Sequence, residues 1–423
     1  MNVLVLGSGG REHAISWKIS QSNLLNELYI APGNAGTTEL GRNIPLDISD
    51  FEAVGVFSLE KKINMIIVGP ENPLVMGFVD FFKSHDHLKD ILIVGPDREA
   101  AMLEGSKDFA KQFMQKYGIP TAAFKSFDKD TFSEAKSFLR NMNPPYVLKA
   151  DGLAAGKGVL ILNDLDQAYY QLSEMFDGKF GEAGKKVVIE EFLSGIELSV
   201  FVLTDGNSYI LLPEAKDYKR IGEADTGLNT GGMGAVSPVP FANSDFMEKV
   251  ETGIIKPTLR GLQEEGIDFH GFIFFGLINV NGNPYVIEYN VRMGDPEAEV
   301  VIPRIKSDLL ELFAGVCEGD LCEKMIEIEN RTVTTVMLVS GGYPGSYDRG
   351  MIISGIKKVR DSIVFHAGTR IDSGKLLTNG GRVLAVSSYG NNLQDALEVS
   401  YANADKIHFE GMYFRKDIGF DLS

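Results

Sequence analysis

The sequence predicts a multidomain protein of the α/β and α+β classes that begins with a doubly wound parallel sheet. Its 423 residues are too many for one hydrophobic core, so about two to four domains are expected. The first hundred residues alternate short apolar runs with helical segments, and a turn with glycine or proline follows each run. The remaining residues contain strands joined by tight turns, which is typical of α+β domains.

Residues 1–104 form the predicted doubly wound domain. Its buried strands are expected at four apolar runs: Val3–Leu6, Leu28–Ile30, Met65–Val68 and Ile91–Val94. Continuous apolar runs of this length are typical of parallel strands that are covered on both faces. Ligands bind at the carboxyl ends of such strands, so the turns at Gly7–Gly10 and Gly69–Asn72 are candidate binding sites.

The rest of the chain divides into four further segments. Phe109, Phe113 and Tyr117 recur at helical spacing behind Ser106, which predicts a capped linker helix. A β-rich segment follows, and the segment after it contains a hairpin that turns at Asn281–Asn283. The last segment alternates short strands with turns. We expect these four segments at residues 105–120, 121–193, 194–330 and 331–423.

The composition argues against several classes of protein. A formal charge of −17 disfavours a surface that binds nucleic acid, because such surfaces carry cationic side chains. The apolar runs are shorter than a membrane span, and the N-terminus lacks the basic region of a signal peptide. Cys317 and Cys322 fit no zinc pattern, so we expect reduced thiols in a cytoplasmic protein.

Two glycine turns of the first domain are candidate substrate contacts. Gly9 and Gly10 open a helix after the first strand, which suits a phosphate group, although a turn needed only for packing is the alternative. A dinucleotide-binding fingerprint would need glycine where Glu12 stands, and it would need an acid at the end of the second strand. The second turn contains Gly69, Pro70 and Glu71. Its carboxylate suits sugar hydroxyl groups or an amine, and a turn capped by Glu71 and Asn72 is an equally good interpretation.

The strongest local feature is a strand–loop–strand segment at Tyr146–Leu162. Lys149 ends the first strand, and the loop contains Gly156, Lys157 and Gly158. Glycines let the backbone approach phosphate oxygens, and lysines neutralise them. The segment is not a Walker A motif, because no Ser or Thr follows the lysine and a strand comes next. A hairpin with surface lysines is the alternative, but apolar strands on both sides favour a triphosphate site.

Two other segments carry candidate contacts whose alternative is a solvated surface. Glu197 is a candidate partner of ribose hydroxyl groups, and Asp217 and Lys219 place charge on a long loop that suits a lid. The strand end that suits an adenine edge contains Glu190, Glu191, Phe192 and Leu193.

A candidate metal site lies at the end of the strand Tyr285–Tyr289. Glu288 and Asn290 share one face of this strand because side chains alternate, and Mg²⁺ takes such oxygen ligands. A tight turn follows with further charged and rigid residues: Arg292, Asp295, Pro296 and Glu297.

With these residues assembled, the chain resembles the ATP-grasp enzymes, and within them the phosphoribosylamine–glycine ligase family. The matching segments follow one another in order over nearly the whole chain, so the resemblance is specific. They are VLGSGGREHA at 5–14, GPENPLVMG at 69–77, LKADGLAAGKGV at 148–159, DYKRIGEADTGLNTGGMGAVSP at 217–238, NVRMGDPEAE at 290–299 and TNGGRVLAV at 378–386.

The resemblance implies central ATP-grasp domains, of which residues 121–193 form the mobile half, and a small C-terminal domain. It implies an ATP-dependent ligase of purine biosynthesis that joins glycine to 5-phosphoribosylamine through glycyl phosphate, with Mg²⁺ or Mn²⁺. We also expect a monomer. Three alternatives remain open: another ATP-grasp carboxylate–amine ligase or carboxylase, a dinucleotide-dependent oxidoreductase, and a non-catalytic nucleotide sensor.

The resemblance also implies roles for single residues. The ATP phosphates would meet Lys107, Lys149 and the loop Gly156–Gly158, and the base and ribose would meet Glu190–Leu193 and Glu197. The metal ligands would be Glu288 and Asn290. The residues with catalytic roles would be Arg292, Asp217, Lys219 and Asp295. The residues that hold substrate would be Gly9, Gly10, Gly69, Pro70, Glu71, Pro296 and Glu297.

Two departures from the family pattern bear on these roles. Met293 stands where the family commonly has phenylalanine, which we expect packing to tolerate. The strand Phe272–Val280 carries no carboxylate, although ATP-grasp enzymes often have a metal ligand there. Substrate and water would then have to supply the remaining oxygen ligands.

Overall fold

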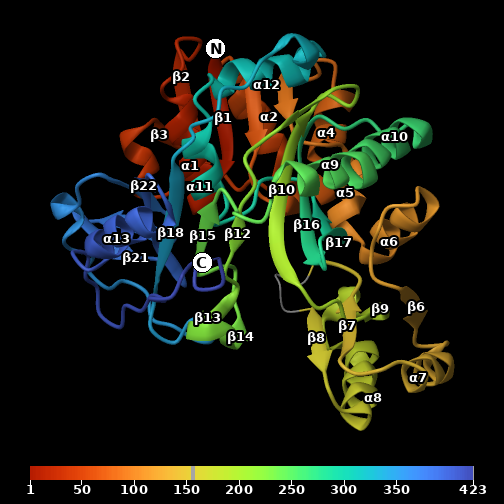
Figure 1. The fold of residues 1–423 in the computed structure, drawn as a ribbon. Helices are drawn as coiled ribbons and strands as arrows, with labels where there is room; N and C mark the ends of the chain where they lie inside the picture. Colours follow the sequence, from red (N-terminus) through yellow and green to blue (C-terminus); the bar gives the residue numbers. More distant parts are fainter. Residues whose placement is uncertain (154–157, 423) are drawn as a thin grey trace.

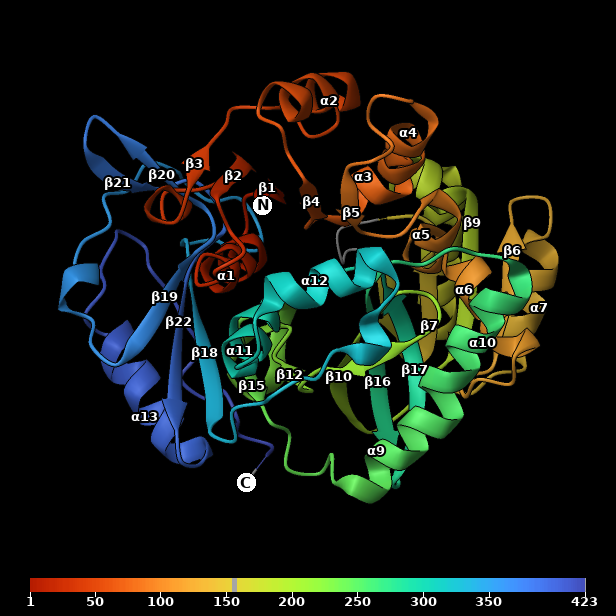
Figure 2. The same cartoon turned by 90° about the horizontal axis from the view of Figure 1, so that it is seen from above.

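The computed structural model describes residues 1–153 and 158–422, and Figures 1 and 2 show it from two directions. The N-terminal part is a five-stranded parallel sheet with the order β3-β2-β1-β4-β5. Its strands are β1 (Asn2–Gly7), β2 (Glu27–Pro32), β3 (Arg42–Asn43), β4 (Met65–Val68) and β5 (Leu92–Val94). The helices between and after them are α1 (Gly10–Ile19), η1 (Thr37–Glu39), α2 (Phe51–Glu60), α3 (Glu71–Val75), α4 (Phe78–Ser84) and α5 (Arg98–Gly105).

Both faces of this parallel sheet are buried, which explains its continuous apolar runs. Leu4 and Leu6 point to one hydrophobic core, which also contains residues of α2, α4 and the central sheet. Val3 and Val5 point to a second core, which contains residues of α1, α11 (Ala298–Arg304) and α12 (Leu309–Glu318). Because successive side chains of β1 enter these two cores in turn, the strand packs against other parts of the molecule on both faces. The predicted fold class is confirmed.

The linker helix α6 (Lys107–Lys116) leads to a four-stranded antiparallel sheet with the order β6-β9-β7-β8. Ser106 caps α6 as predicted, because its hydroxyl accepts a hydrogen bond from the backbone N–H of Phe109. In Figure 1 this sheet and its helices project below the rest of the molecule. Its elements are β6 (Phe124–Asp128), α7 (Phe132–Arg140), β7 (Tyr146–Ala150), β8 (Val159–Leu162), α8 (Leu165–Glu174), η2 (Met175–Lys179), η3 (Gly181–Lys185) and β9 (Lys186–Glu191).

The central sheet has the order β11-β10-β16-β17 and is antiparallel. The turn between β16 and β17 lies at Asn281 and Gly282, and both residues have positive φ. This is the hairpin turn predicted from the sequence. Helices α9 (Ser244–Val250), η5 (Glu251–Ile255) and α10 (Lys256–Glu265) lie beside it in Figure 2. The strands are β10 (Ile196–Thr204), β11 (Tyr209–Leu211), β16 (Gly271–Val280) and β17 (Asn283–Asn290).

The C-terminal sheet, of order β12-β15-β18-β22-β19, takes two strands from the segment that precedes it. These are β12 (Lys216–Asp217) and β15 (Gly234–Ser237), which pair with β18 (Thr332–Val339) through β15. The remaining elements are η6 (Leu321–Glu323), η7 (Ile356–Lys358), β19 (Ser362–His366), β20 (Thr369–Asp372), β21 (Lys375–Thr378), β22 (Arg382–Gly390) and α13 (Leu393–Ala404). The segment between β12 and β15 thus leaves this sheet and returns to it.

That segment, residues 217–233, is not the irregular loop that its composition indicates. It contains a two-stranded hairpin, β13 (Arg220–Gly222) and β14 (Thr226–Asn229), with the short turn η4 (Glu223–Asp225) between the strands. We refer to residues 217–233 as the substrate loop. Among the described residues, no helix is long and apolar enough to cross a membrane.

Candidate active site

The main cavity has a volume of about 420 Å³ and collects charged side chains from distant parts of the chain. Helices α1, α3 and α5 of the N-terminal part, helix α6, the strands β7 and β9, the hairpin β16–β17 and the substrate loop all contribute to its lining. The charged side chains that line it are Arg11, Glu71, Glu104, Lys107, Lys111, Lys149, Glu190, Asp217, Lys219, Glu288, Arg292, Asp295, Glu297 and Arg382. Most of the residues proposed from the sequence therefore face one space.

Three of these side chains form a buried cluster at the end of the cavity nearest β7 and β9. One oxygen of Glu190 lies 3.0 Å from the Lys149 ammonium and 2.9 Å from the Lys111 ammonium. Burial lowers the pKa of Lys111 to about 8, although Glu190 opposes the shift. Sequence reasoning missed Lys111. The signal was its position four residues after Lys107, which places both amines on one face of α6.

Lys107 ties the linker helix to the start of the glycine-rich loop. Its ammonium donates a hydrogen bond to the carbonyl of Gly152 at 3.2 Å, and burial lowers the pKa of this lysine. Gly158 is buried at the far end of the loop, and its carbonyl accepts a hydrogen bond from the Ala150 N–H. Gly156 and Lys157 lie outside the described residues.

A second cavity, also of about 420 Å³, adjoins the first and shares Lys149, Glu190 and Glu288 with it. The strand end Glu190–Leu193 lines it, and the Phe192 side chain is exposed. Glu197, predicted to meet ribose hydroxyl groups, forms an ion pair of 2.7 Å with Lys219. Strands β8, β10 and β17 contribute residues to the lining of this cavity, as does the aromatic side chain of Phe192, which could pack against a planar base.

The two candidate metal ligands lie at the end of β17. A β-bulge opposite Gly276 interrupts the pairing with β16 next to Glu288, and Glu288 lines both cavities. The Asn290 amide oxygen accepts a hydrogen bond from Arg292 at 3.1 Å, while its buried amide nitrogen has no partner among the described residues. These residues fit a hard cation: they offer one carboxylate and one amide oxygen.

The described residues contain no group of three or more His, Cys, Asp or Glu side chains placed to hold a metal ion. This agrees with the lack of a carboxylate on β16, where Gly276 faces Glu288. Magnesium usually keeps several water or phosphate oxygens and needs only one or two protein ligands. The pair Glu288 and Asn290 is therefore adequate for a cation that is shared with a phosphorylated substrate.

Arg292 is held over the cavity by carboxylates from the N-terminal part of the chain. Its Nη2 atom lies 2.7 Å from Glu104, whose other oxygen accepts a hydrogen bond from the Val291 N–H at 2.9 Å. Glu71 lies 3.5 Å from Nε of the same arginine. Although burial opposes it, the nearby cations Arg292 and Arg11 lower the pKa of Glu71. Glu104 was missed in the sequence because it resembles any acid in an amphipathic helix.

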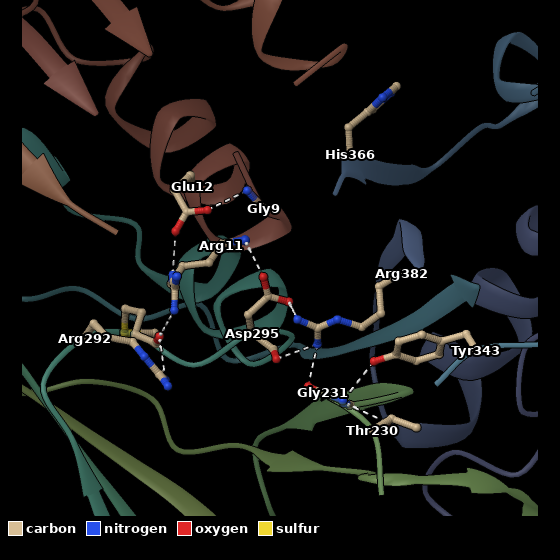
Figure 3. Close-up of polar contacts among 12 residues, drawn as sticks. Gly9, Arg11, Glu12, Thr230, Gly231, Arg292, Asp295, Tyr343, His366 and Arg382 are labelled. Carbon is tan, nitrogen blue, oxygen red and sulfur yellow. Dashed lines mark hydrogen bonds and ion pairs between the residues drawn. The ribbon is translucent and has the colours of Figure 1, made fainter. Parts of the chain in front are cut away.

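Asp295 lies between two arginines from opposite ends of the chain (Figure 3). Its carboxylate accepts a hydrogen bond from the Arg11 backbone N–H at 3.3 Å and forms a 2.9 Å ion pair with Arg382 of β22. Arg382 also donates to the carbonyls of Asp295 and Gly231. Asp295 lines the main cavity and two further cavities beside the glycine turn, so it lies where all three meet.

Asp217 and Glu297 place two buried carboxylates in the same region. Burial, followed by the negative charge of Asp217, raises the pKa of Glu297 to about 7. The Ser199 hydroxyl donates to Glu297 at 2.9 Å. Burial also raises the pKa of Asp217, whereas Lys219 opposes this shift. Two acids that repel each other in this way favour a cationic ligand between them.

In the glycine turn after β1, the backbone amide of Gly9 contacts a side chain of the helix that follows. The N–H of Gly9 already donates to the carboxylate of Glu12 at 2.6 Å, and Arg11 pairs with the other oxygen of Glu12 at 2.6 Å. A Cβ atom on Gly69 would lie 2.2 Å from Glu12. The positive end of helix α1 is thus occupied by a side chain of the helix itself.

The other predicted substrate residues border this turn. A Cβ atom on Gly10 would lie 2.0 Å from the fully buried Glu299, so only glycine fits there. Pro70 and Gly9 line a cavity of about 500 Å³ together with Asp295. Pro296 packs against Gly232 of the substrate loop.

Three models of one protein family match consecutive parts of the chain. The N domain of phosphoribosylglycinamide synthetase matches residues 1–104, its ATP-grasp domain matches residues 105–298, and its C domain matches residues 333–421. Among characterised sequences, the phosphoribosylamine–glycine ligase of Chlorobaculum tepidum is 45% identical over 427 residues, covering 99% of each chain. That of Vibrio cholerae is 44% identical, covering 99% of this chain and 98% of its own.

Solved structures agree with this assignment. The phosphoribosylamine–glycine ligase of Thermotoga maritima superposes with a TM-score of 0.86 at 37% identity, covering 99% of this chain and all of its own. A biotin carboxylase from Campylobacter jejuni reaches a TM-score of 0.71 at 17% identity, covering 99% and 94% of the two chains, which indicates a shared fold alone. The chain therefore belongs to the phosphoribosylglycinamide synthetase family, the ATP-grasp phosphoribosylamine–glycine ligases.

Proposed function

We propose that the protein joins glycine to 5-phosphoribosylamine with the consumption of ATP, giving glycinamide ribonucleotide, ADP and phosphate in purine biosynthesis. The observation that carries this proposal is the cavity in which Lys149, Glu288 and Arg292 converge with the acidic pair Asp217 and Glu297. One cavity then contains both cationic side chains that can bind a triphosphate and acidic side chains that can bind the ammonium group of an amino acid.

The reaction requires an activated carboxylate. A free carboxylate is a poor electrophile, so transfer of the γ-phosphoryl group to glycine makes glycyl phosphate, which has a good leaving group. Phosphoryl transfer is chiefly a matter of positioning and of neutralising charge. We assign Lys107 and Lys149 to the phosphates, with Lys157 of the intervening loop, and the strand end Glu190–Leu193 to the base.

Arg292 stands where the developing charge of the transferred group needs a partner. Its ion pair with Glu104 fixes the guanidinium, and its Nη1 atom, which donates to the Met293 carbonyl, has a second N–H group that can meet a phosphoryl oxygen. Glu288 and Asn290 would hold the divalent cation, Mg²⁺ with Mn²⁺ as a substitute, and the cation would neutralise phosphate charge when bound.

We assign the glycine ammonium group to Asp217 and Glu297. Two buried carboxylates give this site an affinity for a cation, and the nearby positive charge of Lys219, which pairs with Glu197, favours the ionised form of Asp217. Glycine has no side chain, so its recognition depends on the ammonium and on the space around Cα.

The second substrate, 5-phosphoribosylamine, is assigned to the cavities beside Gly9, Pro70 and Glu71. These cavities meet the main cavity at Asp295, where the amine nitrogen must attack the acyl phosphate. As the new C–N bond forms, the nitrogen loses a proton, and Asp295 is the carboxylate placed to accept it.

The remaining assignments concern the whole molecule. We propose a monomer, and, because both cysteines are free thiols, a cytoplasmic protein. Its domains would be residues 1–104, 121–193, 194–330 and 331–423, with the linker helix at residues 105–120.

The experiment that tests the function measures phosphate release from Mg·ATP with glycine, with and without phosphoribosylamine generated in situ. Release that needs both substrates, with glycinamide ribonucleotide detected by mass spectrometry, is the expected result. Turnover that ignores glycine but responds to another carboxylate would assign a different substrate.

A further inference from the structure

A buried arginine from the last described residues reaches the substrate loop. Arg415 is fully buried, and its Nε and Nη2 atoms donate to the two oxygens of Asp417 at 2.8 and 2.9 Å. Its Nη1 atom donates to Asp225 at 2.7 Å and to the carbonyl of Arg220 at 3.1 Å. The hydrogen bonds of this guanidinium thus go either to its own segment or to the hairpin β13–β14.

The same segment, residues 415–422, contacts the loop at a second place. One oxygen of Asp421 accepts a hydrogen bond from the Tyr218 hydroxyl at 2.8 Å, and the other lies 3.1 Å from the ammonium of Lys216. The Arg415 guanidinium also lies 5.3 Å from the centre of the Tyr218 ring. We call residues 415–422 the tail segment, and Figure 1 shows the C-terminus beside β12 and β13.

The tip of the hairpin needs such support. Ala224 and Asp225 have φ angles of 51° and 52°, a left-handed conformation that side-chain-bearing residues adopt at a cost in free energy. The N–H of Ala224 donates to Asp417 at 2.6 Å, so the tail segment holds both strained residues. Residues 226–229 are exposed, and most other bonds at the tip are within the hairpin itself.

The position of the hairpin matters because its two ends border the candidate active site. Arg220, Asp225 and Asn229 line the cavity assigned to the nucleotide base, and so does Asp421 of the tail segment. At the base of the loop, Asp217 and Lys219 line the main cavity. A shift of the hairpin would therefore alter the wall of one cavity and the acidic group of the other.

We propose that Arg415 is a positioning residue that, through Asp225 and Asp417, fixes the hairpin β13–β14 and thereby the shape of the nucleotide and glycine sites. The part that concerns these ligands rests on the proposed function. Arg415 touches neither cavity, and it acts only through the loop. A purely structural ion pair, the competing explanation, would change the stability of the fold and leave ligand affinity unaltered in the folded protein.

The test compares Asp225→Asn, Arg415→Lys and Arg415→Met with the wild type by amide hydrogen exchange and by calorimetric binding of Mg·ATP without glycine. Asp225→Asn removes the charge on the loop side, and that side chain is 43% exposed, so the variant is expected to fold. We expect the amide exchange rate in residues 217–233 and the Kd for ATP each to rise about tenfold. A change of this size corresponds to the loss of one charged hydrogen bond. Arg415→Lys, which keeps the charge but loses the fork, should be milder than Arg415→Met.

A matched control is Arg331→Lys, which alters a surface pair with Glu329 far from the loop in sequence and should leave both readouts unchanged. Unchanged exchange in the loop of folded Asp225→Asn would overturn the proposal, and so would faster exchange with unaltered ATP affinity and glycine KM. If Arg415→Met does not fold, Arg415→Lys decides together with Asp225→Asn, because Asp225 itself lines the nucleotide cavity whereas Arg415 lines neither cavity. The exchange experiment contains no substrate, so its outcome stands even if the wild type fails to turn over glycine, which would refute only the proposed function.

Discussion

At the scale of single residues, the candidate site depends on side chains that hold other side chains. Arg292 is the clearest case, because Glu104 from helix α5 both pairs with its guanidinium and accepts a hydrogen bond from the N–H of the preceding residue, Val291. A buried acid with two such bonds leaves its partner little freedom. The orientation of Arg292 is thus determined by a residue far away in the sequence.

Replacing Glu104 with glutamine tests this arrangement. The amide keeps the shape of the carboxylate but loses its charge, so Arg292 is expected to be less well fixed. Steady-state kinetics should show kcat lowered by about tenfold or more, with a smaller change in the KM for ATP. Glu99→Gln, on the exposed face of the same helix, is the control and should leave both constants unaltered. A change confined to KM would assign Glu104 to substrate binding.

Glu297 gives a prediction about stability and pH. Its folded-state pKa of about 7 lies above the ordinary value of 4.5, so its proton stabilises the fold at acidic pH. This contribution is complete below the unfolded pKa and is lost as pH rises through about 7. It amounts to at most about 3 kcal/mol. In urea unfolding between pH 4.5 and about 7, the free energy of unfolding of Glu297→Gln should fall less than that of the wild type. Parallel curves for the two proteins would contradict the assignment.

The sequence revealed most of these residues because they lie in short motifs. Lys149, Glu288 and Arg292 stand at strand ends or in tight turns, where the local pattern already suggests a role. Lys111, Glu104 and Arg382 stand in ordinary helices and strands, and only the folded chain brings them to the cavity. The contact between Glu12 and the Gly9 amide could not be predicted from the motif either, because it depends on the side-chain conformation in the folded turn.

At the scale of elements, the hairpin β16–β17 positions the metal pair. The bulge opposite Gly276 displaces the register just before Glu288, and a Cβ atom on Gly276 would lie 3.1 Å from Cγ of that glutamate. The glycine therefore provides the space in which the carboxylate sits.

Substitution of Gly276 by alanine should push Glu288 by a few tenths of an ångström. We expect the Mg²⁺ concentration for half-maximal activity to rise several-fold, on the order of 1 kcal/mol in metal binding, while the fold persists. Gly253→Ala, where a Cβ atom would meet nothing within 4 Å, is the control. An identical metal titration for wild type and Gly276→Ala would remove Glu288 from the metal site.

The elements themselves were largely predictable. The apolar runs predicted the parallel strands, and the Asn-Gly turn predicted the hairpin β16–β17, because both are local sequence patterns. The hairpin in the substrate loop was missed for a physical reason: its strands have no alternating apolar face, and contacts with the tail segment support its tip. Strands β12 and β15 join the C-terminal sheet through pairings that no local pattern encodes.

At the scale of the whole molecule, Arg382 connects three parts of the chain at Asp295 (Figure 3). It comes from the C-terminal sheet, pairs with the turn after β17 and donates to the substrate loop at Gly231. Gly231 in turn donates from its N–H to the Tyr343 hydroxyl at 3.0 Å. This junction therefore connects the main cavity with the cavities beside the glycine turn.

Arg382→Lys should loosen this junction without removing its charge. A lysine cannot reproduce the fork that contacts one carboxylate and two carbonyls, so the KM for phosphoribosylamine should rise about tenfold. ATP affinity, measured without the other substrates, should change little. Arg370→Lys, on the hairpin β20–β21, serves as the control. Weakened ATP binding alone would place Arg382 on the nucleotide side.

The central claim is that glycine is activated as glycyl phosphate before the amine attacks. The most direct measurement supplies glycine whose carboxylate carries a heavy oxygen isotope and analyses the phosphate released during turnover. The account predicts that one labelled oxygen of each glycine appears in the inorganic phosphate, because the bond to phosphorus forms through the carboxylate. Release of unlabelled phosphate, with one labelled oxygen found in the amide product and the other in water, would contradict it.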